Sequence, residues 1–138
     1  MIVAGLTNSF KEQLLLGVHD LIVDTIKIAL YTADAELSPD TTEYTTTEEV
    51  SGVGYSAGGQ VLTSVTVSLN NGIAYASFDN PVWNAATFST RGALIYNFSK
   101  SNKSIAVLNF GIDQTMLSQQ LQISLPPNNF DSALIRIS

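Results

Sequence analysis

The amino-acid sequence predicts an all-β fold, an antiparallel β-sandwich or barrel of about seven or eight short strands with one short N-terminal helix. Apolar and polar residues alternate in several segments, and turn-forming residues recur at intervals of roughly ten residues. The chain has 138 residues, of which 45% are hydrophobic, so it is long enough to bury a core of its own. We therefore expect a single domain over residues 1–138, in which residues 1–17 form an N-terminal arm and a short helix.

The clearest local signal is a β-hairpin in residues 60–79. Apolar residues of its first arm share one parity, namely Val61, Val65, Val67 and Leu69. This period of two is typical of a strand with one buried and one solvated face. Asn71-Gly72 tolerates the positive φ angles of a tight reversal, and a second β-rich arm follows. Because a lone hairpin is unstable in water, we expect other strands to pack over its apolar face.

Residues 7–17 are predicted to form a short helix. Ser9 and Glu12 have the spacing of a capping box, and Gly17 is a plausible stop. Phe10 and Leu14 lie on the same side, and so short a helix must dock this side to be stable. Two docking sites stay open at this point: the protein's own sheet, or a neighbouring subunit.

The other strands are expected in segments rich in β-branched and aromatic residues. These segments are residues 21–23, 25–31, 91–97, 104–110, 119–125 and 133–137, with a loop expected over residues 111–118. Ile26, Ile28 and Leu30 share one face of their strand, and residues 91–97 and 104–110 are expected to pair as a second hairpin. Trp83, the only tryptophan, is interpreted either as a core anchor or as a solvent-facing binding platform.

An acidic segment follows the first predicted strands. No Lys or Arg occurs between Ile28 and Thr90. Six carboxylates crowd the segment instead: Asp34, Glu36, Asp40, Glu43, Glu48 and Glu49. We expect an exposed loop with one short strand at most, which is either simply solvated or a docking surface for a basic partner. A cation site is a further alternative, although the spacing matches no calcium-binding loop.

Composition narrows the classes of partner. The net charge of −6 and the pI of about 4.4 argue against nucleic acid and anionic membranes, which both need a positive face. There are no cysteines, and we find neither a secretion signal nor a membrane span, so synthesis in a cytoplasm is expected. Only 13% of residues are charged, so we expect part of the surface to be covered by a partner or by sister subunits.

Few residues suggest catalysis. The single histidine, His19, has no Gly-x-Ser-x-Gly elbow to work with, and the carboxylates cluster in one loop instead of facing each other across a cleft. The glycines between Gly52 and Gly59 precede a strand and not a helix, so a turn or bulge explains them better than a phosphate site. We therefore expect no enzyme, and no catalytic, cofactor-binding or metal-binding residues. A metal-dependent hydrolase is a third reading that would require a bound metal.

Five segments, taken in order, resemble a group of small virion proteins of tailed bacteriophages. They are GLTNSFK (residues 5–11), KIALYT (27–32), GYSAGGQ (54–60), FDNPVW (78–83) and RGALIYN (91–97). This resemblance spans nearly the whole chain and implies a particle component, most specifically a capsid cement or decoration protein. It implies a virion location after synthesis in the host cytoplasm, and the major capsid protein or another virion protein as partner. A homo-oligomer is expected, a trimer in preference to a dimer.

Two regions are predicted to contact the partner, the apolar N-terminal segment and the acidic loop. The predicted contact residues are Ile2, Val3, Leu6, Phe10, Asp34, Glu36, Asp40, Glu43, Glu48 and Glu49. The alternative function is a host- or glycan-binding β-sandwich module of a tail or head fibre. In that case exposed Trp83, Tyr44 and Tyr55 would form the binding platform.

Overall fold

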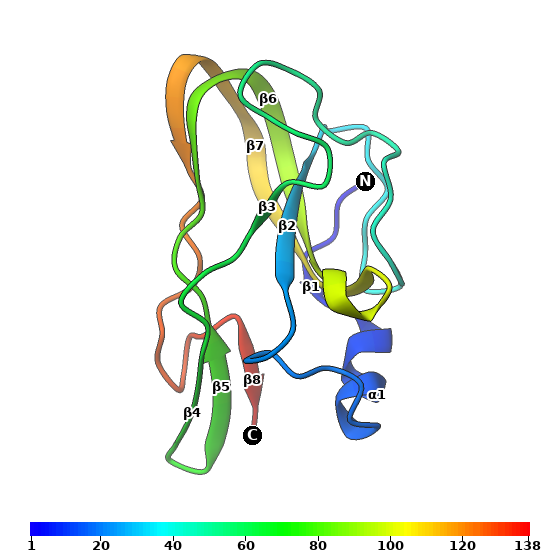
Figure 1. The fold of residues 1–138 in the computed structure, drawn as a ribbon, viewed down its shortest axis with the longest axis vertical. Helices are drawn as coiled ribbons and strands as arrows, with labels where there is room; N and C mark the ends of the chain where they lie inside the picture. The colour runs from blue at the N-terminus through cyan, green and yellow to red at the C-terminus, as the bar shows by residue number, and fades with distance from the viewer.

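The computed structural model describes residues 1–138 and contains two antiparallel sheets with one short helix (Figure 1). The elements are β1 (Gly5–Leu6), α1 (Asn8–Leu15), β2 (Ile26–Tyr31), β3 (Gln60–Val61), β4 (Thr66–Asn70), β5 (Ile73–Ser77), β6 (Val82–Asn97), a 3-10 turn (Phe98–Lys100), β7 (Lys103–Gln122) and β8 (Ile135–Ile137). A five-stranded sheet has the order β1-β7-β6-β2-β3, and a three-stranded sheet has the order β4-β5-β8. The predicted all-β, antiparallel, sandwich-like fold with an N-terminal helix is confirmed.

β6 and β7 form one long, bent ribbon. They have 16 and 20 residues and pair from Val82↔Gln122 to Asn97↔Lys103, with four register shifts on the way. Figure 1 shows both strands curving over at one end of the molecule. The predicted second hairpin is therefore confirmed, but the loop expected over residues 111–118 is wrong. Gly111 and Ser118 have φ of 82° and 51°, and such bulges break the alternation that identifies a strand.

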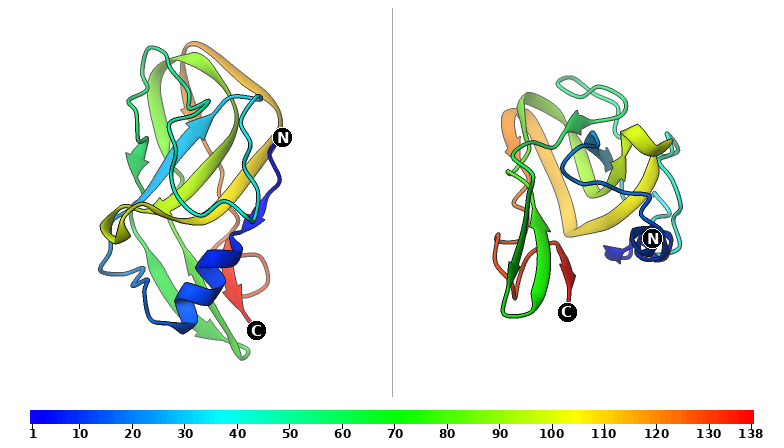
Figure 2. Two further views of the ribbon diagram at one scale, coloured as in Figure 1. Left: turned by 90° about the vertical axis from the view of Figure 1, so that its right-hand side faces the viewer. Right: turned by 60° about the horizontal axis from the view of Figure 1, so that its bottom comes forward.

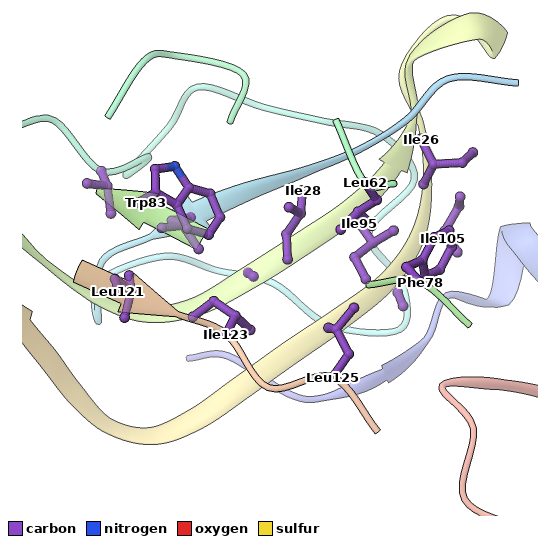
Figure 3. Close-up of a cluster of buried hydrophobic side chains, with 14 of the residues drawn as sticks. Ile26, Ile28, Leu62, Phe78, Trp83, Ile95, Ile105, Leu121, Ile123 and Leu125 are labelled. Carbon is purple, nitrogen blue, oxygen red and sulfur yellow. The ribbon is translucent and has the colours of Figure 1, made fainter. Parts of the chain in front are cut away.

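β2 is the centre of the molecule and is buried on both faces. Its residues pair with β6 from Ile26↔Asn97 to Tyr31↔Gly92. Ile26, Ile28 and Leu30 point into the main core, as predicted from their parity, and none is more than 1% exposed. Figure 3 shows Ile28 and Ile95 in this core, together with side chains from other strands. The predicted strand at residues 21–23 is wrong, because these residues form a turn.

Trp83 belongs to the same core. Its exposed fraction is 5%, and its ring stacks on Tyr55 at 6.3 Å between centroids. Figure 3 shows Trp83 beside the strands with Leu121 and Ile123 below it. The core-anchor interpretation of Trp83 is therefore confirmed, and the solvent-facing platform is wrong.

The helix docks on the protein's own sheet. Phe10 is fully buried in the main core, and the Thr7 backbone N–H donates to the Ile105 carbonyl of β7 at 2.9 Å. The predicted capping box is wrong. Thr7, not Ser9, precedes the first helical residue, and the Ser9 hydroxyl lies 3.4 Å from that of Ser104 instead. Ser9 therefore finds its polar partner in β7 and not in Glu12 of its own helix.

The predicted hairpin is confirmed as β4 and β5. Asn71 and Gly72 have φ of 52° and 76°, the left-handed values that a two-residue reversal needs. Its first arm is shorter than predicted, because residues 60–61 form β3 and pair with β2 in the other sheet. The expectation that its apolar face is covered holds only at one end, where Ala76 is buried in the main core, and is wrong toward the turn, where Val67 and Leu69 are 53% and 76% exposed.

Gly59 marks the closest approach of the chain to β2. Its φ is +77°, and a Cβ atom there would lie 1.7 Å from the Ile28 carbonyl oxygen. Gly72 has nearly the same φ of +76° but has nothing within 4 Å of a Cβ. Comparing an alanine substitution at each glycine therefore separates the free-energy cost of backbone strain from that of a steric clash.

We expect Gly59→Ala to lower the free energy of unfolding far more than Gly72→Ala. The left-handed conformation alone costs an alanine about 1–2 kcal/mol, and only Gly59→Ala adds a backbone clash that must displace β2. Urea unfolding of both variants measures the difference. Equal losses at the two positions would contradict the close approach of Gly59 to β2.

Candidate functional site

The acidic loop (residues 34–49) covers the outer face of the five-stranded sheet. Ala29, Tyr31 and Leu94 point to this face, and they form a second apolar cluster with Leu37 of the loop. Figure 2 (left) shows the loop, in cyan, crossing in front of the sheet. β2 is thus buried because the main core lies on one side and the acidic loop on the other.

Backbone contacts hold the first half of the loop. Ile2 and Leu37 form a parallel bridge, and the Val3 N–H donates to the Leu37 carbonyl at 2.8 Å. Ala35 and Leu37 are each 1% exposed, whereas Glu36 between them points to solvent. This alternation buries the apolar side chains of the loop and displays a carboxylate.

The second half of the loop is tied to the start of β7 and the turn before it. The Ser104 hydroxyl donates to the Thr41 carbonyl at 2.6 Å, and the Tyr44 N–H donates to the Asn102 carbonyl at 2.9 Å. The Tyr31 hydroxyl of β2 donates to the Thr45 carbonyl at 2.6 Å. The loop is therefore a fixed layer of the structure and not a mobile connection.

The Glu49 carboxylate is the hub of this layer. Its Oε1 accepts from the Tyr44 hydroxyl at 2.6 Å, and its Oε2 accepts from the Tyr55 hydroxyl at 2.5 Å and from the Gly58 N–H at 2.8 Å. The Tyr55 oxygen also accepts from the Leu30 N–H of β2 at 3.0 Å. A half-buried carboxylate with three donors of this kind forms strong, charge-assisted hydrogen bonds.

The tyrosines around Glu49 are held in their neutral form. Burial and the hydrogen bond to Glu49 both raise the pKa of Tyr44 and of Tyr55 well above the usual value of 10.0. Burial raises the pKa of Tyr96 to about 12, and its hydroxyl donates to the Gly58 carbonyl at 2.6 Å. Tyr96 also stacks on Tyr44, with 4.7 Å between ring centroids. The network therefore keeps its donors through the neutral pH range.

The structure separates the six predicted acidic contact residues into two groups. Glu49 is half-buried and serves the protein's own tyrosines. The other five carboxylates are exposed: Asp34, Glu36, Asp40, Glu43 and Glu48. Four of these form no ion pair within the chain, since only Glu36 has an ion-pair partner. The loop therefore presents unpaired negative charge on a rigid support.

Two of the four predicted N-terminal contact residues are internal. Ile2 and Phe10 are buried at 6% and 0% exposure, so the expectation that they contact a partner does not fit this fold. They fill the outer apolar cluster and the main core instead. Leu6 is half-buried, and Val3 is exposed.

His19 belongs to a polar cluster beside the helix. The Asn97 amide donates to Asp24 at 2.8 Å and lies 3.0 Å from His19 Nδ1, while His19 Nε2 lies 2.7 Å from the Gln13 oxygen. Asp24 is also paired with Lys100 at 3.1 Å. These contacts give His19 a role in fixing the segment after α1.

The alternative sites suggested by the sequence find little support in the geometry. No three His, Asp or Glu side chains lie close enough together to hold a metal ion. The aromatic platform expected of a glycan-binding module is not formed, because Trp83 is buried and the Tyr44 and Tyr55 hydroxyls both bind Glu49. None of the helices has the length and apolar character needed to cross a membrane.

No family model, curated protein or solved structure matches this chain.

We expect Glu49→Ala to lower the free energy of unfolding by at least about 2 kcal/mol, because it leaves three donors without their acceptor. Glu43→Ala is the matched control, since that carboxylate is exposed and has no side-chain partner, and it should change stability by no more than about 0.5 kcal/mol. Urea unfolding measures both. Similar values for the two variants would show that the hub does not hold the loop.

We expect the stability of the protein to fall as pH is lowered through the range in which histidine titrates. Burial lowers the pKa of His19 below 6.5, with smaller opposing and reinforcing effects from Asp24, Lys100 and Lys103. As pH falls, His19 is protonated in the unfolded chain before it is protonated in the folded protein. The free energy of unfolding therefore decreases from pH 6.5 down to the folded-state pKa of His19. In His19→Gln, the drop in unfolding free energy between pH 7.5 and pH 5.5 should be smaller than in the wild type.

Proposed function

We propose that this protein is a structural component of a tailed-bacteriophage particle, a capsid cement or decoration protein that binds a basic surface of a capsid protein. The observation that carries the proposal is the acidic loop. Four of its exposed carboxylates have no ion-pair partner, and Asp34 and Glu43 are two of them. The loop that carries them is fixed to the central sheet. A surface of one sign selects partners of the opposite sign and speeds their encounter.

The rigidity of the acidic loop suits binding to a preformed lattice. A mobile loop pays conformational entropy when a partner orders it, whereas this loop is already held by Leu37, Ser104 and Glu49. Each contact can then be small, because many copies act together on a symmetric particle. The partner is the major capsid protein or another virion protein, and the location is the virion after synthesis in the host cytoplasm.

The segments by which the sequence resembles phage virion proteins support the same proposal. GYSAGGQ (residues 54–60) contains Tyr55, Gly58 and Gly59, which bind Glu49 or pass against β2. RGALIYN (residues 91–97) contains Tyr96, which binds the Gly58 carbonyl. Two of the five segments that carry the resemblance therefore contribute residues that hold the acidic loop in place.

The acidic face also limits the kind of partner. Nucleic acid and anionic lipid surfaces would be repelled by it, because both carry dense negative charge. A basic protein surface is the complement that remains, and binding to it should weaken as salt screens the charges.

We expect neutralisation of the loop to weaken binding to particles that lack this protein. The triple variant Asp34→Asn, Asp40→Asn, Glu43→Gln should bind at least about tenfold more weakly and with a shallower salt dependence, because three carboxylates that attract the partner are lost. Quantitative cosedimentation with such particles at two salt concentrations measures both effects.

The matched control removes the same charges elsewhere. Glu12→Gln, Asp79→Asn, Asp131→Asn also neutralises two aspartates and one glutamate, all exposed and outside the loop. This variant should bind like the wild type. Equal weakening of both triple variants would mean that only net charge matters, and failure of the wild type to bind particles would overturn the cement function itself.

A further inference from the structure

A groove of about 410 Å³ separates the end of α1 from the three-stranded sheet. One wall is formed by Leu14, Leu21 and Ile22, and the other by Val67, Ala74 and Ile137 among others. Figure 2 (right) shows α1 and the sheet of β4, β5 and β8 standing on opposite sides of this region. Nothing in the acidic loop borders the groove, so it is a surface separate from the one described above.

Aliphatic side chains extend from the groove onto both of its rims. Seven are more than half exposed: Leu15, Leu16, Ile22, Val23, Val67, Leu69 and Ile137. Scattered exposed aliphatic residues are ordinary in soluble proteins, but three of these seven, Ile22, Val67 and Ile137, line the groove, and the other four lie within two residues of a lining residue in the sequence. The face of β4 and β5 that the sequence pattern marks as internal is therefore left open near Val67 and Leu69.

The apolar area fits a standard protein–protein interface. A fully exposed Val, Leu or Ile side chain presents roughly 60–120 Å² of apolar area, so the seven together present roughly 300–600 Å². One side of a standard interface covers about 800 Å², of which a little more than half, about 450 Å², is apolar. The open face is thus large enough to form the apolar part of such an interface.

The charge distribution favours a second copy of this chain as the occupant of the groove. The chain carries a net charge of −6, so two copies repel each other wherever their carboxylates meet. The groove side avoids this, because residues 50–78, which include β4 and β5, contain no charged residue. Asp20 is the only carboxylate that lines the groove, and its Oδ1 accepts from the Ile22 and Val23 N–H groups. A basic partner would gain little attraction here, whereas an identical acidic chain meets little repulsion.

We propose that this groove and the open face of the sheet of β4, β5 and β8 form the interface between copies of this chain. The occupant of the groove is a second copy, which contributes its own aliphatic side chains. β4 and β8 are the edges of their sheet, and each has only one neighbouring strand within the chain. The contact does not rest on the cement function, because it involves neither the acidic loop nor a capsid protein.

The test is the mass of the purified protein in solution, by sedimentation velocity over a range of concentrations. The wild type should form an oligomer of the 14.8 kDa chain. Ile22→Lys on one wall and Leu69→Lys on the open face of β4 beside the other wall should raise the concentration needed for assembly by about thirtyfold or more, because each buries a charge in the contact.

Two matched controls lie outside the groove. Leu117→Lys is the control for Leu69→Lys, because the two leucines are 75% and 76% exposed. Ile112→Lys is the control for Ile22→Lys, because the two isoleucines are 66% and 60% exposed. Both controls should assemble like the wild type. Circular dichroism should show all four variants folded, because each replaces a side chain that is already exposed.

Three results would overturn the interface. They are a wild type that is monomeric at every concentration, groove variants that assemble as the wild type does, and control variants that dissociate as readily as the groove variants. A monomer that binds particles only when its groove is intact would assign the face to the capsid protein instead. Because mass is measured without particles, failure here and failure of the cement function are distinguishable.

Discussion

The outer layer of this molecule depends on the Glu49 carboxylate. β2 is buried on both faces, so the strand requires a cover on the side away from the main core. That cover consists of loop segments, which lack a ladder of backbone hydrogen bonds to hold them. Glu49 supplies the missing constraint by accepting from Tyr44, Tyr55 and Gly58 at once. The hydrogen bonds of Glu49 therefore join the backbone contacts of Leu37 and the hydroxyl of Ser104 in holding the acidic loop over the central strand.

Local patterns in the sequence predicted local structure well. The Asn71-Gly72 turn and the inward face of β2 followed from turn chemistry and parity, which depend on neighbouring residues. Parity also placed Val67 and Leu69 on one face of β4, but it does not say how far that face is covered, and here the core covers it at Ala76 and leaves Val67 and Leu69 exposed. Coverage is a tertiary property, and so a correct strand prediction came with a burial prediction that holds for only part of the hairpin.

The remaining differences have the same origin in long-range contacts. The bulges at Gly111 and Ser118 let β7 bend, and they interrupt the alternation that would have identified one continuous strand. The cluster of carboxylates was visible in the sequence, but the special position of Glu49 was not. Its donors come from Tyr44 and Tyr55, whose spacing matches no recognisable motif, and only the fold brings them to one carboxylate.

The two surfaces that we assign to binding have to be separate for an acidic chain. If copies met through the acidic loop, like charges would face each other, and the loop would no longer be open to a basic partner. The proposed contact along β4 and β5, which carry no charged residue, would remove both conflicts and leave every acidic loop of the oligomer free. Several loops on one assembly then bind as a linked set, so the affinity of the whole can exceed that of each contact by orders of magnitude. Under these two proposals, the strength of attachment would be set less by any single carboxylate than by the number of loops that the oligomer places over capsid sites together.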